Sequence, residues 1–103
     1  MPAYLIANVE VRDPEAFAAY SRQVAPVVAS SGGRFLVRGG DAHALEGGLG
    51  RKRLVVIEFP SMDAARRFYD SPEYAPLLRL RQDSAASEVA LVEGWTPPSG
   101  VAA

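Results

Sequence analysis

The chain has 103 residues, a net charge of −1, 49% hydrophobic residues and 22% charged residues. A chain of this length forms one domain, and its composition is typical of a globular protein rather than a disordered one. The near-neutral charge excludes a basic surface for nucleic acid, because the one basic cluster, residues 51–53, is short and follows a glycine-rich loop, as at a solvated hairpin tip. The absence of cysteine excludes disulfides, thiolate metal sites and a cysteine nucleophile.

No apolar run reaches the length of a membrane span, and the first residues alternate as in a strand rather than a signal peptide. We therefore expect a cytoplasmic protein with no membrane partner. Lys52 is the one lysine among the eleven lysine and arginine residues, a usage that indicates a bacterial source of high GC content. Residues 1–96 are predicted to form the single domain, and residues 97–103 a flexible tail.

The first predicted element is a strand at residues 3–11, in which the side chains alternate with a period of two. Asp13 and Pro14 then predict the start of a helix, because aspartate is a good N-cap and proline fits the first helical position. We expect this helix to reach Ser30 and to end at the glycines of residues 32–33.

The second strand is predicted at residues 34–38. An irregular connection at residues 41–50 follows, with a short extended piece at residues 42–46. Residues 53–59 form the clearest strand of the sequence, because they are dense in β-branched side chains and stop at Pro60.

Two further helices are predicted from capping signals. Ser61 caps the first, and the pair Ser71 and Pro72 predicts a second one through Leu78. A last strand is expected at residues 87–95. The order β-α-β-β-α-β predicts an α+β, ferredoxin-like domain, with a four-stranded antiparallel sheet and the helices on one of its faces.

The sheet face away from the helices is predicted to be apolar. Strict alternation places five large side chains there: Tyr4, Ile6, Leu36, Leu54 and Val56. Such a patch is larger than a monomer usually exposes, and a second copy of the sheet is its simplest cover. We therefore expect a homodimer. A solvated sheet with scattered surface aliphatics is the alternative.

Several stretches resemble the domain of unknown function 1330 family, over nearly the whole chain up to Trp95. They are residues 33–40, 45–47, 53–61, 64–66, 69–74 and 92–94, together with Arg81. The resemblance implies a dimeric α/β barrel, in which two sheets face each other and enclose a cavity. It implies no particular chemistry. Proteins of the same superfold include cofactor-free monooxygenases, muconolactone isomerases and haem-degrading enzymes, by analogy of fold alone.

Three polar residues are candidates for a ligand pocket on the face away from the helices. Strict alternation places Asn8, Arg38 and Glu58 among the apolar side chains of that face. In one interpretation Arg38 and Glu58 form a structural ion pair at the dimer seam. In the other they orient a polar or anionic small molecule between the facing sheets, with Glu58 as a possible base.

Two tyrosines complete the candidate pocket. Tyr69 and Tyr74 flank the break between the last two helical segments, where their phenols could reach a cavity mouth. The alternative interpretation is that both rings pack the helices onto the sheet and leave their hydroxyls in water.

Metal and cofactor sites are not expected. His43 is the only histidine, and together with Asp41 and Glu46 it gives a weak metal pattern within a glycine-rich loop. The sequence leaves a cofactor-independent oxygenase or isomerase acting on a small molecule as the first hypothesis, and a non-catalytic dimeric binding or scaffold protein as the second. A haem or metal protein is the third.

Overall fold

The computed structural model describes residues 1–50 and 52–98. In chain order, the elements are β1 (Ala3–Val11), α1 (Pro14–Ser30), β2 (Arg34–Arg38), β3 (Arg53–Phe59), α2 (Met62–Tyr69), α3 (Ala75–Ser84) and β4 (Ala85–Glu93). Arg51 of the basic cluster and residues 99–103 of the predicted tail lie outside the described residues.

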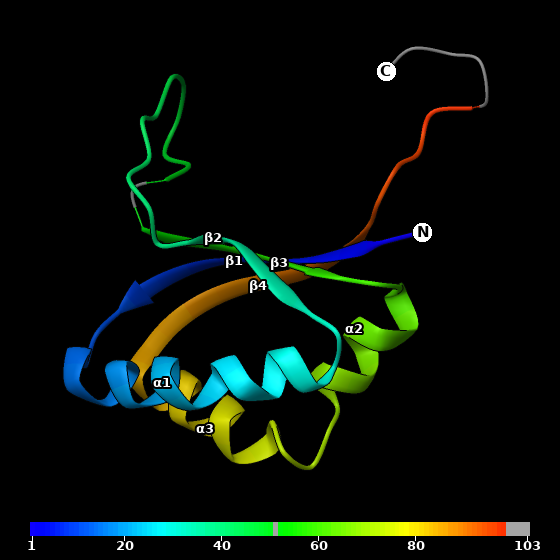
Figure 1. Ribbon diagram of the computed structural model, residues 1–103. Coiled ribbons are helices and arrows are strands. Elements are labelled where there is room, and N and C mark those ends of the chain that lie inside the picture. The colour runs from blue at the N-terminus through cyan, green and yellow to red at the C-terminus, as the bar shows by residue number, and fades with distance from the viewer. Residues whose placement is uncertain (51, 99–103) are drawn as a thin grey trace.

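The four strands form one antiparallel sheet in the order β2-β3-β1-β4. The three helices lie on the same face of this sheet and leave the other face uncovered (Figure 1). The predicted α+β, ferredoxin-like architecture is therefore confirmed. Within residues 1–50 and 52–98, none of the helices has the length and hydropathy needed to cross a membrane.

The predicted caps start the first two helices. The Asp13 carboxylate accepts a hydrogen bond from the backbone N–H of Ala16 at 3.1 Å. The Ser61 hydroxyl accepts one from the backbone N–H of Ala64 at 3.0 Å. Each side chain thereby satisfies one of the N–H groups that has no partner inside its helix.

The third helix and the last strand both differ from the predicted bounds. Helix α3 begins after Tyr74 rather than at Pro72, because the Ser71 hydroxyl closes a separate turn by accepting from the backbone N–H of Tyr74 at 3.2 Å. Strand β4 runs from Ala85 to Glu93 rather than over residues 87–95, because it pairs along the whole length of β1 and ends where β1 begins.

The hydrophobic core lies between the sheet and the helices. Its centre is formed by Phe59, Phe68 and Val28, whose exposed fractions are 0%, 1% and 1%. The rings of Phe59 and Phe68 lie 5.3 Å apart. Burial of aromatic and aliphatic side chains on this face is the main stabilising contribution to such a domain.

A β-bulge in β2 changes which side chains face the helices. Phe35 pairs with Ile57 and Val37 pairs with Val56, so Leu36 is an extra residue on the β2 side. Beyond the bulge the alternation of β2 is inverted. Arg38 consequently lies opposite Val55, on the face that the helices cover.

The connection between β2 and β3 is irregular throughout the part that the structure describes. The short extended piece predicted at residues 42–46 forms no strand there. Residues 39–49 are exposed, His43 among them. This loop adds no side chain to the core and leaves the sheet at its four strands.

Candidate functional site

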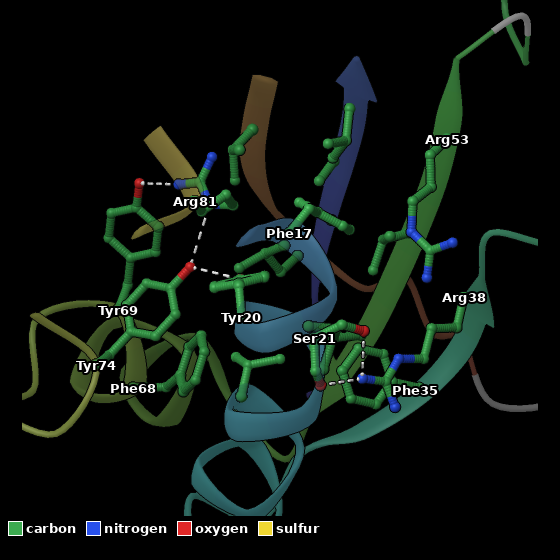
Figure 2. Close-up of a pocket in the computed structure, with 17 residues that line it drawn as sticks. Phe17, Tyr20, Ser21, Phe35, Arg38, Arg53, Phe68, Tyr69, Tyr74 and Arg81 are labelled. Carbon is green, nitrogen blue, oxygen red and sulfur yellow. Dashed lines mark hydrogen bonds between the residues drawn. The ribbon is translucent and has the colours of Figure 1, made fainter. Parts of the chain in front are cut away.

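A pocket lies inside the domain, between the sheet and the helices (Figure 2). Much of its wall is aliphatic: Leu5, Ala7, Val24, Val55, Ile57 and Val89. The enclosed space measures about 40 Å³, which is room for a few water molecules. The pocket is therefore on the opposite side of the sheet from the face on which the sequence predicted one.

The charges that line this pocket are all of one sign. Arg38, Arg53 and Arg81 are among the lining residues, and within the described part of the chain no aspartate or glutamate joins them. The whole chain carries a net charge of −1. The excess of positive charge is therefore a local property of the pocket, and it favours anions there.

Arg81 is the most deeply buried of the three arginines, with an exposed fraction of 7%. Its Nε donates to the phenol oxygen of Tyr74 at 3.3 Å, and its Nη2 donates to that of Tyr69 at 3.3 Å. Tyr74 is itself only 2% exposed. No carboxylate of the described residues pairs with Arg81, and Nη1 donates to none of them.

Tyr20 joins this cluster from helix α1. Its hydroxyl lies 2.9 Å from the hydroxyl of Tyr74, at hydrogen-bond distance. Burial raises the pKa of the Tyr20 phenol far above its usual value, and the neighbouring Tyr74 raises it further. Tyr20 therefore keeps its proton at any physiological pH and is a neutral hydrogen-bonding group. Figure 2 shows the phenols of Tyr69 and Tyr74 meeting Arg81, and Tyr20 joined to Tyr74.

The pKa of Arg81 is affected in two directions. Burial alone lowers it, but contact with the phenol oxygens, mainly that of Tyr74, outweighs this effect and raises the pKa overall. The guanidinium therefore stays charged although it is buried.

Arg38 and Arg53 lie across the sheet from Arg81, on strands β2 and β3 (Figure 2). The Nη2 of Arg38 donates to the Ser21 carbonyl at 2.6 Å and to its hydroxyl at 3.1 Å. The Arg38 guanidinium also lies 4.1 Å from the centre of the Phe35 ring. These contacts connect β2 to α1 at the edge of the pocket.

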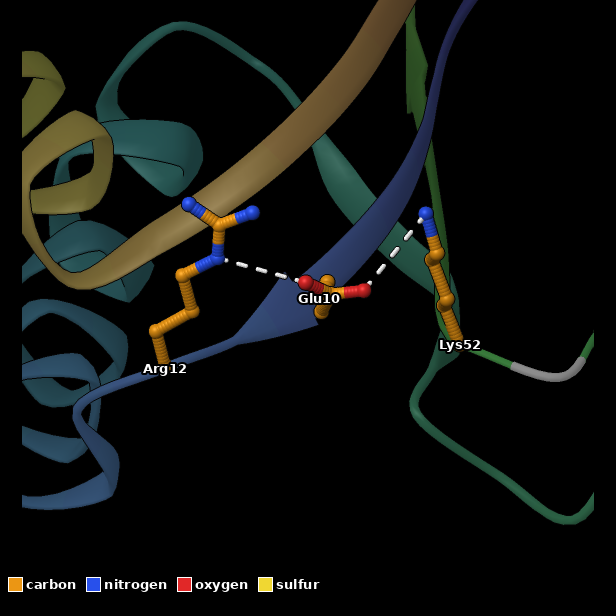
Figure 3. Close-up of polar contacts among 3 residues, drawn as sticks. All are labelled: Glu10, Arg12 and Lys52. Carbon is orange, nitrogen blue, oxygen red and sulfur yellow. Dashed lines mark hydrogen bonds and ion pairs between the residues drawn. The ribbon is translucent and has the colours of Figure 1, made fainter.

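The basic cluster at residues 51–53 is divided between solvent and the pocket. Lys52 points outward and pairs with Glu10 at 3.8 Å, and Glu10 also accepts from Arg12 at 3.2 Å (Figure 3). Arg53 instead turns inward, 5.6 Å from the centre of the Phe17 ring. A solvated hairpin tip thus describes Lys52 but not Arg53.

A second hollow of about 430 Å³ lies between α2 and the edge strand β4. Tyr69 and Val89 line both spaces. The one charged residue of this hollow, Arg66, already pairs with Asp70 at 3.8 Å. The hollow therefore offers a ligand an apolar surface but no unpaired charge.

The predicted ion pair between Arg38 and Glu58 does not form. Glu58 lies on the uncovered face, where it pairs with Arg34 at 2.8 Å and accepts a hydrogen bond from the Tyr4 hydroxyl at 3.3 Å. Arg38 lies on the other face because the bulge inverts the alternation of β2. Burial, and then the contact with Glu58, raise the pKa of Tyr4. Glu58 is therefore not available as a base in the pocket.

Asn8 is also on the uncovered face, between Leu54 and Glu88 in the register of the sheet. Its Oδ1 is buried and accepts no hydrogen bond from the described residues. Large apolar side chains near it stay exposed to solvent: Ile6 at 39%, Leu36 at 47%, Val37 at 37% and Val92 at 45%. The expected apolar face is present in the single chain.

Of the predicted pocket residues, Arg38, Tyr69 and Tyr74 line the observed pocket, whereas Asn8 and Glu58 do not. Sequence reasoning assigned no role to Arg81, although it lies seven residues after Tyr74 and so on the same face of the helical segment. Tyr20 carried no comparable signal, because it is 54 residues away from Tyr74 in the sequence.

Comparisons with known proteins place the chain in a family. The sequence model of the family described as domain of unknown function (DUF1330) matches residues 2–95. No curated protein matches the chain.

Solved structures share the fold. A protein of unknown function from Rhodopseudomonas palustris is 24% identical, over 93% of this chain and 84% of that chain, with a TM-score of 0.74. A cofactor-independent oxygenase from Streptomyces nogalater is 19% identical, over 95% and 97% of the two chains, with a TM-score of 0.62. A dimeric ferredoxin-like protein of unknown function from Jannaschia is 12% identical, over 91% and 100%, with a TM-score of 0.64.

Proposed function

Because the chain belongs to the DUF1330 family, which is described only as a domain of unknown function, we propose a function from its own pocket. In this proposal the protein is a homodimer, and each subunit binds a small organic acid between its sheet and its helices. The acidic group meets Arg81, and the apolar part of the molecule lies against the aliphatic wall.

The observation that carries this proposal is the environment of Arg81. A guanidinium that is 7% exposed and has only phenol oxygens as partners lacks a counter-charge among the described residues. Burial of an unpaired ion costs several kcal/mol, and a carboxylate at hydrogen-bond distance offsets much of that cost. A ligand anion supplies the missing charge, and Nη1 of Arg81 is the nitrogen left to donate to it.

Entry of such a ligand requires a change at the edge of the pocket. The enclosed space of about 40 Å³ is too small for a molecule with a ring. Arg38 is exposed and bridges β2 to α1 through its contacts with Ser21. Rotation of this long side chain toward solvent widens the mouth, and the aliphatic side chains behind it also have to shift before a ring fits beside Arg81.

Conversion of the ligand is the second candidate function, and the pocket restricts which conversions fit. No carboxylate or imidazole of the described residues lines it, so abstraction of a proton from carbon lacks a base there. A phenol or an enol is a weak acid whose anion the Arg81 guanidinium would stabilise, so that its proton passes to water without a carboxylate or imidazole base. The similarity in fold to a cofactor-independent oxygenase is compatible with this chemistry.

The dimer is proposed from the uncovered face of the sheet. A second copy of the same face would cover its exposed aliphatic side chains. The dimeric ferredoxin-like relative from Jannaschia supports this assembly.

Benzoate tests the binding proposal, because it combines one carboxylate with an apolar ring. We expect an NMR titration to show benzoate binding to the wild-type chain, and Arg81→Met to weaken that binding by roughly ten- to a hundredfold, since a charge-assisted hydrogen bond contributes about 1.5–3 kcal/mol. Arg79→Met is the matched control, because Arg79 is an exposed arginine of the same helix. Benzamide should bind far more weakly than benzoate.

Far-UV circular dichroism and thermal melting establish that each variant is folded. Arg81→Lys gives a second measure of what the guanidinium contributes to benzoate binding. It keeps the positive charge but loses the planar group that contacts two phenols. Failure of benzoate to bind the wild-type chain, or equal binding by Arg81→Met, contradicts the proposal.

A further inference from the structure

The pocket has cationic groups at two places rather than one. Arg81 lies on α3 beside β4, whereas Arg38 and Arg53 lie on the adjoining strands β2 and β3. In the sheet order β2-β3-β1-β4, strand β1 lies between β3, which carries Arg53, and β4, beside which Arg81 lies. We propose, on the basis of the proposed binding of an organic acid, that the ligand is a dianion with an acidic group at each end and a flat apolar middle.

The surroundings of Arg53 indicate a second acidic group in the ligand. Its Nε is buried and has no hydrogen-bond partner among the described residues. Its guanidinium lies over the Phe17 ring, which attracts a cation but accepts no conventional hydrogen bond. A buried donor without an acceptor destabilises the folded chain, and more so when it is charged. An anion at this end of the pocket removes the deficit.

Arg38 reinforces the positive charge at the same end. Two of its interactions are with uncharged groups, the Ser21 carbonyl and the Phe35 ring. It forms no ion pair with the described carboxylates. The Glu10 carboxylate, which contacts the neighbouring Lys52, is already paired with Lys52 and Arg12. Residues 1–50 and 52–98 therefore supply no ion pair to either arginine.

The stretch between the two cationic places is apolar and partly aromatic. Phe17, Val24 and Val55 line it, and the Phe17 and Tyr20 rings lie 5.5 Å apart. These walls fit a planar hydrocarbon body better than a hydroxylated one, because a sugar-like body would leave hydroxyl groups unpaired. An aromatic or unsaturated dicarboxylate matches both the two cationic places and the apolar stretch between them.

Three probes of almost equal size test this inference: terephthalate, which has two carboxylates, 4-carbamoylbenzoate, which has one, and terephthalamide, which has none. We expect terephthalate to bind the wild-type chain about ten- to a hundredfold more tightly than 4-carbamoylbenzoate, since one extra charge-assisted contact is gained. Terephthalamide should bind most weakly. NMR titration measures all three in the same buffer and at the same ionic strength.

Arg53→Met locates the second acidic group. We expect this variant to lose the preference for terephthalate, to about twofold or less, and to bind 4-carbamoylbenzoate as the wild-type chain does. Lys52→Met is the matched control, because it removes the neighbouring charge that points away from the pocket. Arg38→Met is a second variant at the same end, and it should reduce the preference in part.

The outcomes separate the two proposals. If neither terephthalate nor 4-carbamoylbenzoate binds, the proposed function fails, and this inference with it. If 4-carbamoylbenzoate binds and terephthalate is no tighter, the organic-acid pocket stands and the dianion is wrong. If terephthalate is tighter but Arg53→Met and Arg38→Met both keep the full preference, the second acidic group lies elsewhere and the inference is overturned.

Discussion

The two faces of the sheet differ in whether their arginines have a carboxylate partner. On the uncovered face Arg34 lies 2.8 Å from the Glu58 carboxylate, and its side chain is 71% exposed. On the covered face Arg81 is 7% exposed and contacts only phenol oxygens. An arginine in water needs no partner, whereas a buried one does. Arg34, which needs no partner because it is exposed, has a carboxylate partner. Arg81, which is buried, has none among the described residues.

This difference is what we expect if the uncovered face is the proposed dimer surface and the covered pocket is the proposed anion site. The uncovered face combines a neutralised charge with exposed aliphatic side chains, which suits association with a second copy. The covered face keeps an excess of positive charge within apolar walls.

The largest effect is expected from a charge placed in the middle of the uncovered face. Val56 lies opposite Ile6 and Val37 there. In a dimer, Val56→Glu would bury two like charges close together, so we expect the dissociation constant to rise by at least about a hundredfold. Sedimentation velocity across micromolar concentrations measures this change. Ala29→Glu, on the exposed side of α1, is the control that should stay dimeric.

Arg81→Met should separate binding from stability. The substitution removes the cost of burying the guanidinium but also its contacts with two phenol oxygens, which outweigh that cost in the pKa of Arg81, so the free energy of unfolding should change by about 2 kcal/mol or less. The same substitution removes the anion partner and so weakens benzoate binding. Urea denaturation without ligand measures the first effect. A loss of stability of more than about 2 kcal/mol would instead show that the Arg81 cluster is structural.

Tyr20→Phe should change how stability depends on pH. The pKa of Tyr20 is raised in the folded chain, so above pH 10, the usual pKa of tyrosine, the unfolded chain loses a proton that the folded chain keeps. The contribution of Tyr20 is therefore full below pH 10 and decreases as the pH rises beyond it. We expect the wild-type chain to lose about 1.4 kcal/mol more per pH unit than Tyr20→Phe above pH 10.

Urea denaturation at several pH values between 8 and 11.5 measures the free energy of unfolding of the wild-type chain and of Tyr20→Phe. The separation between the two chains should be constant up to about pH 9 and change only beyond it. Parallel curves over the whole range would contradict the assignment to Tyr20.

The smallest effect is expected on the uncovered face. Arg34→Met and Glu58→Gln each break an ion pair in which the arginine is largely exposed. Such pairs contribute about 1 kcal/mol or less, and salt screens them. Chemical denaturation at low and at high ionic strength checks both the size of the effect and its screening. Benzoate binding should be unchanged in both variants, since neither residue lines the pocket.

Part of the candidate site could be predicted from the sequence. Tyr69 and Tyr74 were placed near a cavity because they flank a helix break, and both line the pocket. Arg38 is predicted on the uncovered face but lies on the covered one, whereas Asn8 and Glu58 lie on the uncovered face as predicted and so outside this pocket. The tyrosines escaped this error because helical segments carry their own orientation signals, whereas a strand takes its orientation from its neighbours.

The sequence by itself determined the elements, their order and the caps of the first two helices. Asp13 and Ser61 act through atoms three residues away, so a local pattern is sufficient to predict them. The alternation of β1 and β3 likewise fixes the apolar pattern of two faces without any knowledge of the partner strands.

Only the tertiary structure decided where the charges lie. The bulge at Leu36 exists because of how β2 pairs with β3, and one extra residue moves Arg38 to the other side of the sheet. The contact between Tyr20 and Tyr74 joins residues that are 54 positions apart. Strand register and long-range packing depend on the whole chain at once, and for that physical reason a local pattern of residues does not contain them.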